Sequence, residues 1–450
     1  MKRFVILLFA WLAVIASIGA QQTPAVQSPY SDAAPQTKEI IDAARLLEAK
    51  GQYSKAWNLL AAFDPDSKDG YVLAEKIRIA LEDSIGNGML VSFSFVDLAE
   101  GQSIYEAFLN PPEKQTIVDF NPLDLVEALE KSSEAIPPIL SLELAGYLYA
   151  VNQQYSDNWM IDGYTIQQKA VENYDRALAY GLYNDKSLAN HAELLMNLQQ
   201  YEGAEKVLRQ AISLFPEELS FAVSLANSLN YQGKFDQVYS VIDKVIEDPD
   251  VTSSTYNAYV EGIKAGLNSG DTQKTDLYVD AMIERFPDEY APMLIQHLVA
   301  VIMGEIEEAN VSADSVTEKF NVDPNVVQSL LSTWLGASDP VSGFDYLNRS
   351  LEKYTSDDQA MGTLFFYRAL MYAQTARSAD DLKLAIVDME ETEKRFSAVY
   401  DKEDPVFQTI EQLLTEWKQI IEQLQESDSA SSSEQSTPPE DSNTASGTSN

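Results

Sequence analysis

The sequence predicts an all-α fold of stacked helical hairpins, and three observations support this. A pattern of small and apolar residues recurs with a period of about 34 residues in the middle of the chain. Within each half of the pattern, apolar residues recur at the three- and four-residue spacing of one helix face. Short polar turns and prolines separate the halves. A repeat of this length is one helix–turn–helix unit, which buries its apolar face only by stacking on its neighbours.

The repeat is clearest between Asp185 and Val251, where two units follow one another without a gap. The residues that match one period apart are Ala192 with Ala226, Leu195 with Leu229, Tyr201 with Phe235, Ala204 with Val238, Leu208 with Ile242, and Ala211 with Val245. Helix axes pack roughly 8–10 Å apart, so alanine at a crossing lets two helices approach closely. Ala170 and Ala177 continue the series one period earlier.

This pattern resembles the tetratricopeptide repeat (TPR), which has small residues where its two helices cross, an aromatic opening the second helix, and a proline after it. The corresponding residues here are Ala192, Ala204, Ala211, Tyr201 and Pro216. His191 and Gln199 depart from the pattern, standing where the family usually has Leu and Gly. The resemblance implies an exported bacterial-type TPR protein, a TPR-like helical-hairpin solenoid with a right-handed superhelix, in which the first helices line a concave binding face.

The N-terminus has the layout of a secretory signal. Lys2 and Arg3 precede the apolar run Phe4–Ile18, and the small residues Gly19 and Ala20 follow it. The run is shorter than the ~20 residues that span a bilayer. We therefore expect export to the periplasm or cell envelope. An uncleaved N-terminal membrane anchor is the alternative, because Ile18 occupies a position where signal peptidases prefer a small residue.

Residues 86–137 break the repeat. The segment Val91–Phe95 alternates apolar and polar residues, which predicts a strand, and helical segments are expected near Ile104–Leu109 and Leu123–Ser132. A small β or irregular insertion near 86–120 and a set of irregular packing helices both fit. The expected division is a signal peptide at 1–20, a linker at 21–36, an N-terminal TPR-like hairpin and helix at 37–85, the insertion at 86–137, core repeats at 138–287, degenerate hairpins with a capping helix at 288–426, and a disordered acidic tail rich in Ser and Thr at 427–450.

Composition limits the function. The formal net charge is −39, a surface that repels nucleic acid and suits a basic partner or cations. Solubility or adaptation to a salty habitat would explain the same charge. The chain contains no cysteine, which excludes disulfides, thiolate zinc sites, cysteine nucleophiles and a lipoprotein anchor.

No catalytic motif is recognisable. The chain lacks a Gly-rich phosphate loop, a G-x-S-x-G elbow and an H-E-x-x-H helix. The two histidines, His191 and His297, are far apart and are expected to be packed helix residues. The stretch Asp64–Glu75 approaches a calcium loop, but Lys68 stands at a ligand position and Gly70 is one place late, which favours an inter-helix turn with an Asp cap. We therefore predict a non-enzymatic protein without cofactor or metal.

The residues expected to contact a partner come from the repeat register. Glu193, Asn197, Asn227, Asn230 and Tyr231 should line the first-helix face, and the long loop after Gln154 should expose Trp159, Met160 and Tyr164. Asn amides can bind a peptide backbone, and Tyr offers a rigid contact. The family's carboxylate clamp needs Lys or Arg beside Asn227, and we find none by register. A solvated face, and a loop folded back onto the repeat, are the alternatives.

Two functions follow. The first is a non-catalytic scaffold of the cell envelope that binds a protein or peptide through its concave face. The second is a periplasmic ligand-binding or transport accessory protein that holds a small molecule within the superhelix. An open polar groove would favour the first, and a closed apolar cavity lined by Trp159 or Tyr231 would favour the second.

Overall fold

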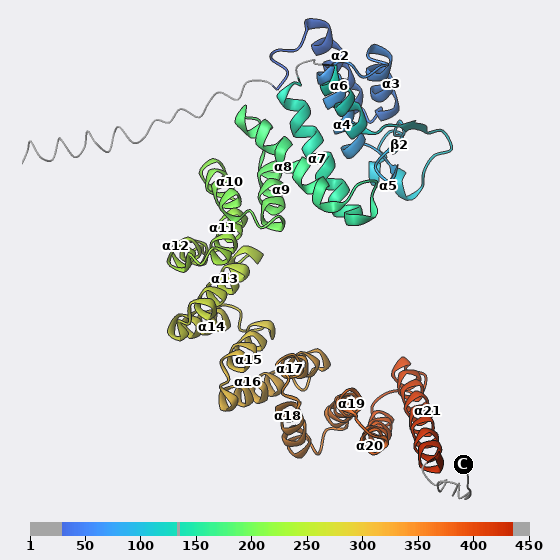
Figure 1. Ribbon diagram of the computed structural model, residues 1–450, viewed down its shortest axis with the longest axis vertical. Coiled ribbons are helices and arrows are strands. Elements are labelled where there is room, and N and C mark those ends of the chain that lie inside the picture. Colours follow the sequence, from blue (N-terminus) through green and yellow to red (C-terminus); the bar gives the residue numbers. More distant parts are fainter. Residues whose placement is uncertain (1–28, 133–135, 435–450) are drawn as a thin grey trace, which may run out of the picture. The chain divides into compact units, whose positions relative to one another are not determined.

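The computed structural model describes residues 29–132 and 136–434, with 20 α-helices and three short strands (Figure 1). The chain divides after Ser269 into two compact units. Within the described residues, no helix combines the length and the apolar character needed to cross a membrane. The signal segment, the first part of the linker and residues 435–450 lie outside the described residues.

The centre of the first unit consists of two successive antiparallel helix pairs, as the repeat predicts. They are α9 (Asp185–Asn197) with α10 (Tyr201–Leu214), and α11 (Ser220–Tyr231) with α12 (Phe235–Ile246). The residues matched at the crossings are buried: Ala204, Ala211 and Val238 are all 0% exposed. The helical-hairpin prediction and its TPR-like register are confirmed here.

The turn inside each pair needs a left-handed residue. Gly233 has a φ of 69°, and Gln199, one repeat earlier, has a φ of 58°. Glycine adopts this conformation without a steric penalty, whereas for a residue with a Cβ it costs about 1 kcal/mol or more. The departure at Gln199 therefore keeps the family's turn geometry at a local cost.

Further helices extend the first unit on both sides of these pairs. They are α2 (Pro35–Glu48), α3 (Tyr53–Phe63), α4 (Gly70–Glu82), α6 (Pro122–Lys131), α7 (Pro138–Tyr155), α8 (Gly163–Ala179) and α13 (Ser253–Ser269). The helices α2 and α3 form a hairpin, α4 packs on α7, α7 pairs with α8, and α13 packs against α11 and α12. The first helices α7, α9, α11 and α13 thus follow one another in repeat order.

The insertion is a small antiparallel sheet. Its strands are β1 (Gly86–Gly88), β2 (Ser92–Phe95) and β3 (Thr116–Asp119), in the order β1-β2-β3, with α5 (Ile104–Leu109) between β2 and β3. The buried face of β2 carries Phe93 and Phe95, and the Trp57 ring of α3 stacks on Phe95 at 4.8 Å. The alternation that predicts a strand therefore marks a face packed on the first hairpin.

The expectation that the loop after α7 exposes Trp159 is wrong. Trp159 is only 7% exposed, its indole Nε1 donates to the Met89 carbonyl at 2.6 Å, and its ring lies edge-on to Tyr147. A buried indole N–H needs an acceptor, and the β1–β2 turn supplies one. Met160 and Tyr164 are more than half exposed, as expected. The loop, which includes the short 3₁₀ helix η1 (Ser156–Asn158), therefore fastens the insertion to α7.

The second unit contains helix pairs of the same kind. Its helices are α14 (Thr272–Arg285), α15 (Ala291–Met303), α16 (Ile306–Lys319), α17 (Pro324–Gly336), α18 (Pro340–Lys353), α19 (Asp358–Thr375), α20 (Ala379–Phe396) and α21 (Pro405–Glu434). The pairs α15–α16, α17–α18 and α19–α20 are the degenerate hairpins that the periodicity predicts. One core surrounds Trp334 and Tyr346, and another joins α20 to α21 through Trp417. The helix α21 ends at Glu434, later than the sequence boundary of 426.

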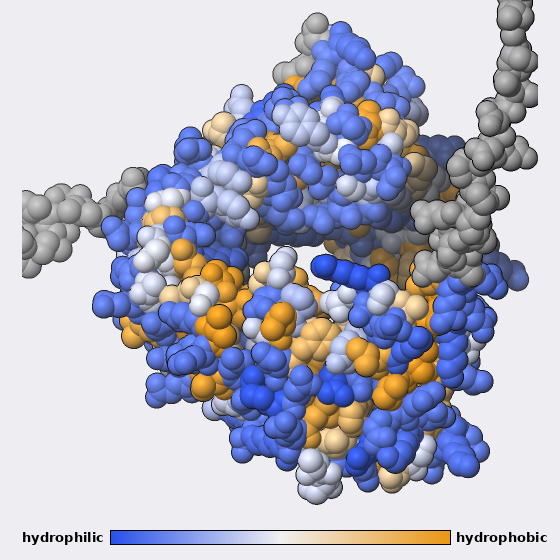
Figure 2. Space-filling model, turned by 60° about the horizontal axis from the view of Figure 1, so that its bottom comes forward, coloured by the Kyte–Doolittle hydropathy of each residue, from blue (hydrophilic) through white to orange (hydrophobic). Residues whose placement is uncertain are grey.

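The surface matches the composition. On the face drawn in Figure 2, hydrophilic residues predominate and hydrophobic residues form separate patches.

Candidate binding groove

A groove of about 600 Å³ runs along the first helices α9, α11 and α13 of the first unit. It is lined by Ala189, Ala192, Glu193, Met196, Asn197, Leu208, Ser220, Phe221, Val223, Ser224, Asn227, Asn257, Val260, Glu261 and Lys264. We call it the α9–α13 groove. Asn197 and Ser224 are exposed to solvent, so the groove is accessible from outside.

Three residues predicted from the repeat register line this groove: Glu193, Asn197 and Asn227. Glu193, Asn227 and Glu261 follow one another at intervals of one repeat period, so they occupy the same position on three successive first helices. The stacking of the repeats therefore places these polar side chains along one groove.

Glu261 is a buried carboxylate held mainly by neutral donors. It is 5% exposed, and its Oε1 accepts from Asn227 Nδ2 at 3.1 Å while its Oε2 accepts from Asn230 Nδ2 at 2.8 Å. Lys264, one turn further along α13, donates its Nζ to Oε1 at 2.7 Å. The two amides from α11 fix the orientation of the carboxylate without neutralising its charge.

Glu193 is likewise oriented by uncharged hydrogen-bond donors, which come from the preceding first helix. The Tyr149 hydroxyl donates to its Oε2 at 2.7 Å, and Gln153 Nε2 donates to its Oε1 at 2.7 Å. Both donors come from α7 and both are uncharged. Burial, followed by the hydrogen bond to Glu193, raises the pKa of Tyr149 to about 12. The Glu193 side chain thus has a fixed orientation, and it remains exposed to an incoming cation.

The remaining lining is largely apolar. Phe221 is 2% exposed and forms part of the floor with Val223 and Val260. Of the described residues that line the groove, Lys264 is the one cation, against the carboxylates Glu193 and Glu261. The groove therefore combines an apolar floor with an excess of negative charge.

The other predicted contact residues lie elsewhere. Asn230 is buried and supports Glu261 from behind. Tyr231 is 64% exposed but stacks on Tyr201, with ring centroids 4.9 Å apart, and does not line the groove. Trp159 is buried under the insertion. The register places a residue on a helix face, whereas neighbouring side chains decide whether it reaches the groove.

Phe221, Glu261 and Lys264 also line the groove, although the repeat register does not single them out. A signal for Glu261 existed, because it lies one repeat period after Asn227, but the slack spacing of the fourth unit hides it. Lys264 lies one period after Asn230 and provides a cation near Asn227, where the sequence predicts none.

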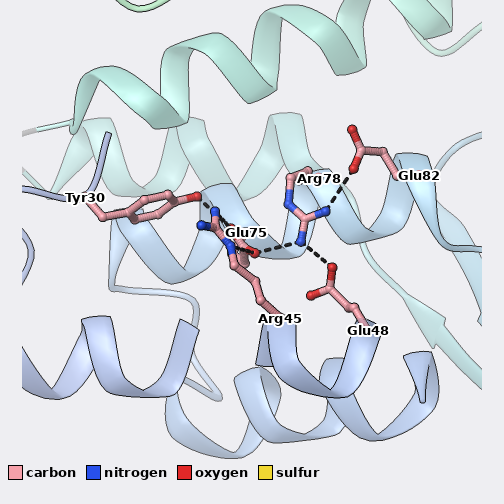
Figure 3. Close-up of polar contacts among 6 residues, drawn as sticks. All are labelled: Tyr30, Arg45, Glu48, Glu75, Arg78 and Glu82. Carbon is pink, nitrogen blue, oxygen red and sulfur yellow. Dashed lines mark hydrogen bonds and ion pairs between the residues drawn. The ribbon is translucent and has the colours of Figure 1, made fainter. Parts of the chain in front are cut away.

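A second polar cluster lies between α2 and α4, and we call it the Glu75 cluster. It comprises Tyr30, Arg45, Glu48, Glu75, Arg78 and Glu82 (Figure 3). Glu75 is 0% exposed; the Tyr30 hydroxyl donates to its Oε2 at 2.6 Å, and Arg45 and Arg78 donate to its Oε1 at 2.8 and 2.7 Å. Arg78 also pairs with Glu48 and Glu82. Cations and a hydroxyl thus surround this carboxylate completely.

The pKa values in this region follow burial and pairing. Burial alone would raise the pKa of Glu75, but the hydrogen bonds from Arg45 and Arg78 outweigh it and hold that pKa below its ordinary value. Among the described residues no cation is hydrogen-bonded to Glu143 of α7, and burial, followed by repulsion from Glu82, raises its pKa to about 8. The Glu75 cluster therefore fastens α2, α4 and the segment at Tyr30 together, and we assign it a structural role.

The stretch that approaches a calcium loop is an inter-helix turn with an Asp cap. The Asp64 carboxylate accepts from the backbone N–H groups of Lys68 and Asp69, and Asp69 caps α4 by accepting from Tyr71 and Val72. Asp66 pairs with Lys68 at 2.8 Å. Protein donors already hold these carboxylates in the described structure.

Both histidines are packed, as expected. His191 is 1% exposed and stacks on Tyr174 at 5.5 Å, at the repeat position that Leu225 fills in the next unit. His297 is 0% exposed, lies edge-on to Trp334 and places its Nδ1 3.0 Å from the Ala309 carbonyl. Burial lowers the pKa of His297. Both rings fill helix interfaces.

No protein-family model and no curated protein matches the chain. Similar solved structures include a tetratricopeptide repeat protein from Parabacteroides merdae, with 12% identity over 86% of this chain and 100% of that one and a TM-score of 0.33. Yeast Tom70 shows 14% identity over 89% of this chain and 85% of its own, with a TM-score of 0.39. A third is Naa15/Naa10 bound to HypK-THB, with 15% identity over 80% of this chain and a TM-score of 0.43; the present chain spans only 51% of that one. The TPR-like fold is established here by the helix pairs themselves.

Proposed function

We propose that the protein is a non-catalytic scaffold whose α9–α13 groove binds a segment of a partner protein with basic character. The observation that carries this proposal is the pair of oriented carboxylates, Glu193 and Glu261, above an apolar floor in one groove. Oriented carboxylates favour Lys or Arg, and the apolar floor favours an aliphatic or aromatic side chain.

The net charge of the chain also favours a basic partner. A molecule with a charge of −39 attracts basic partners over long range and repels acidic ones. The groove adds specificity to that attraction because its donors and carboxylates have fixed positions.

The alternative, a small molecule enclosed within the helices, has less support. The two aromatic residues expected to line such a cavity are engaged elsewhere, Trp159 on Met89 and Tyr231 on Tyr201. The groove is bordered by exposed Asn197 and Ser224, which suits an elongated segment better than an enclosed ligand.

A groove-blocking variant tests the proposal. A random peptide library is selected on the wild-type protein, and the selected peptides are titrated by fluorescence anisotropy. Ser224→Trp fills the groove from an exposed position on α11 and should weaken binding by roughly tenfold or more, equivalent to about 1.4 kcal/mol. Ser240→Trp, at an exposed position on α12, is the matched control and should bind like wild type. Equal affinity in all three proteins would reject the groove as the binding site.

Export is a separate part of the proposal. Its support is the arrangement of Lys2, Arg3 and the apolar run Phe4–Ile18, which lies outside the described residues. N-terminal sequencing of protein recovered from the cell envelope should give a start near residue 21. A start at Met1 would instead favour an uncleaved membrane anchor.

A further inference from the structure

Glu261 is held as a charged group in an unusual way. Burying a carboxylate is costly unless it is paired and hydrogen-bonded. Here two of its three contacts are neutral amides from the neighbouring first helix, Asn227 and Asn230. They orient the carboxylate but leave its charge for a cation to balance. That cation is Lys264 in the free protein.

Lys264 is a weak and replaceable partner. It lies three residues from Glu261 on the same helix, and its side chain is 49% exposed. The lysine end of the pair is half-exposed, so its ammonium is well hydrated when it swings away from the buried carboxylate. Lys264 also lines the groove, so a segment that enters must meet this side chain.

A basic residue of a bound partner is attracted to Glu261 more strongly than Lys264 is. A cation brought in with a bound segment loses water contact, and its attraction to the carboxylate strengthens as the local dielectric falls. A carboxylate has about four acceptor positions, so Glu261 can keep both amide hydrogen bonds and still accept a Lys or Arg. Lys264, once displaced, can return to solvent at small cost.

Glu193 offers a second carboxylate of the same kind. Tyr149 and Gln153 orient it, and within the described part of the chain no ion pair neutralises it. The apolar floor at Phe221 and Val223 belongs to α11, the helix between those that carry the two carboxylates. A complementary segment therefore carries two basic residues with an apolar residue between them.

Resting on the function proposed above, we propose that Lys264 holds the place of the ligand on Glu261, and that a lysine or arginine of a basic–apolar–basic partner segment displaces it. Lys264 then acts as an internal competitor that sets the affinity of the groove. Replacing Lys264 by an uncharged residue should therefore strengthen binding.

The test uses the full-length protein and a selected peptide with at least two basic residues, measured by fluorescence anisotropy. Lys264→Met keeps most of the aliphatic stem, and we expect the affinity to rise roughly three- to tenfold. Glu261→Gln should lower the affinity at least tenfold. Replacing the peptide's basic residues by Ala should abolish the effect of both changes. Lys206→Met, on the exposed side of α10, is the charge-matched control and should change the affinity less than twofold.

A double variant separates direct displacement from a general charge effect. If Lys264 competes at Glu261, Lys264→Met adds no affinity in the Glu261→Gln background. If the gain persists there, it comes from the overall field of the groove, and the displacement proposal is overturned. Far-UV circular dichroism checks that each variant is folded. Lys264→Met alone still decides the matter should Glu261→Gln not fold, because unchanged or weaker binding contradicts the proposal.

The two proposals fail in different ways. If the wild type binds peptides and Ser224→Trp blocks them, but Lys264→Met gains nothing, the groove stands and the displacement is wrong. If no peptide binds, or if Ser224→Trp binds as well as Ser240→Trp, the groove itself is rejected and the displacement with it.

Discussion

Two buried glutamates of the first unit show how surroundings assign a role to one residue type. Glu75 and Glu261 are 0% and 5% exposed. Two guanidinium groups and a tyrosine hydroxyl enclose Glu75. Two asparagine amides and one half-exposed lysine hold Glu261. The first carboxylate is fully compensated inside the protein, whereas the second keeps a charge that a partner can reach.

The difference separates structure from recognition. A compensated carboxylate such as Glu75 makes helix packing specific and costs much stability when it is changed. A carboxylate held by neutral donors, such as Glu261, contributes less to stability but is ready for an external cation. Substitutions at the buried carboxylates measure how far this distinction holds.

The largest effect is expected at Glu75. Glu75→Gln leaves Arg45 and Arg78 without their shared carboxylate in a buried site, and should lower the free energy of unfolding by about 3–5 kcal/mol. Chemical denaturation followed by circular dichroism measures this loss. Glu82→Gln, which removes an exposed partner of Arg78, is the control and should cost less than about 1 kcal/mol. Comparable losses for both changes would remove the special role of Glu75.

The next effect depends on pH and concerns Glu143. Its pKa rises from an ordinary 4.5 to about 8 because burial disfavours the charged form. A raised carboxyl pKa stabilises the fold fully below pH 4.5, and this contribution is lost as the pH rises through 8. Denaturation at pH 5 and pH 9 should show a decline in the free energy of unfolding on the order of 4 kcal/mol, about 1.4 kcal/mol for each pH unit between 5 and 8. In Glu143→Gln the decline should be smaller by that amount, and an identical decline would contradict the assignment.

The smallest effect on stability is expected at Glu261. Glu261→Gln keeps an oxygen acceptor for one of the two Asn amides, sets its own NH2 group against the other, and removes the pair with Lys264. We expect a loss of about 1–2 kcal/mol. Chemical denaturation beside Glu75→Gln gives the comparison directly. A loss as large as that of Glu75→Gln would make Glu261 a structural residue and weaken the case for recognition.

Much of the fold could be predicted because its signals are local. The repeat period and the residues Ala192, Ala204 and Ala211 mark helix crossings, and all three alanines are buried. The alternation of apolar and polar residues in Val91–Phe95 marks β2, and this signal is local as well. The strand β3 (Thr116–Asp119) was not expected, because so short a segment carries little periodicity and β3 exists only through its pairing with β2.

The candidate site could be predicted only in part. Register placed Glu193, Asn197 and Asn227 on the face that lines the α9–α13 groove, since the helical period is fixed. It placed Tyr231 there too, but stacking on Tyr201 holds that ring elsewhere. Trp159 was misjudged because its acceptor, Met89, lies far away in the sequence.

The sequence by itself determined the helix pairs, their period, the strand β2 and the acidic composition, because backbone periodicity and net charge depend on residues close together or on simple counts. Only the tertiary structure decided which carboxylates are neutralised and which remain available. That choice depends on partners far away in the sequence, such as Arg45 for Glu75 and Asn227 for Glu261, which packing alone brings within hydrogen-bonding distance.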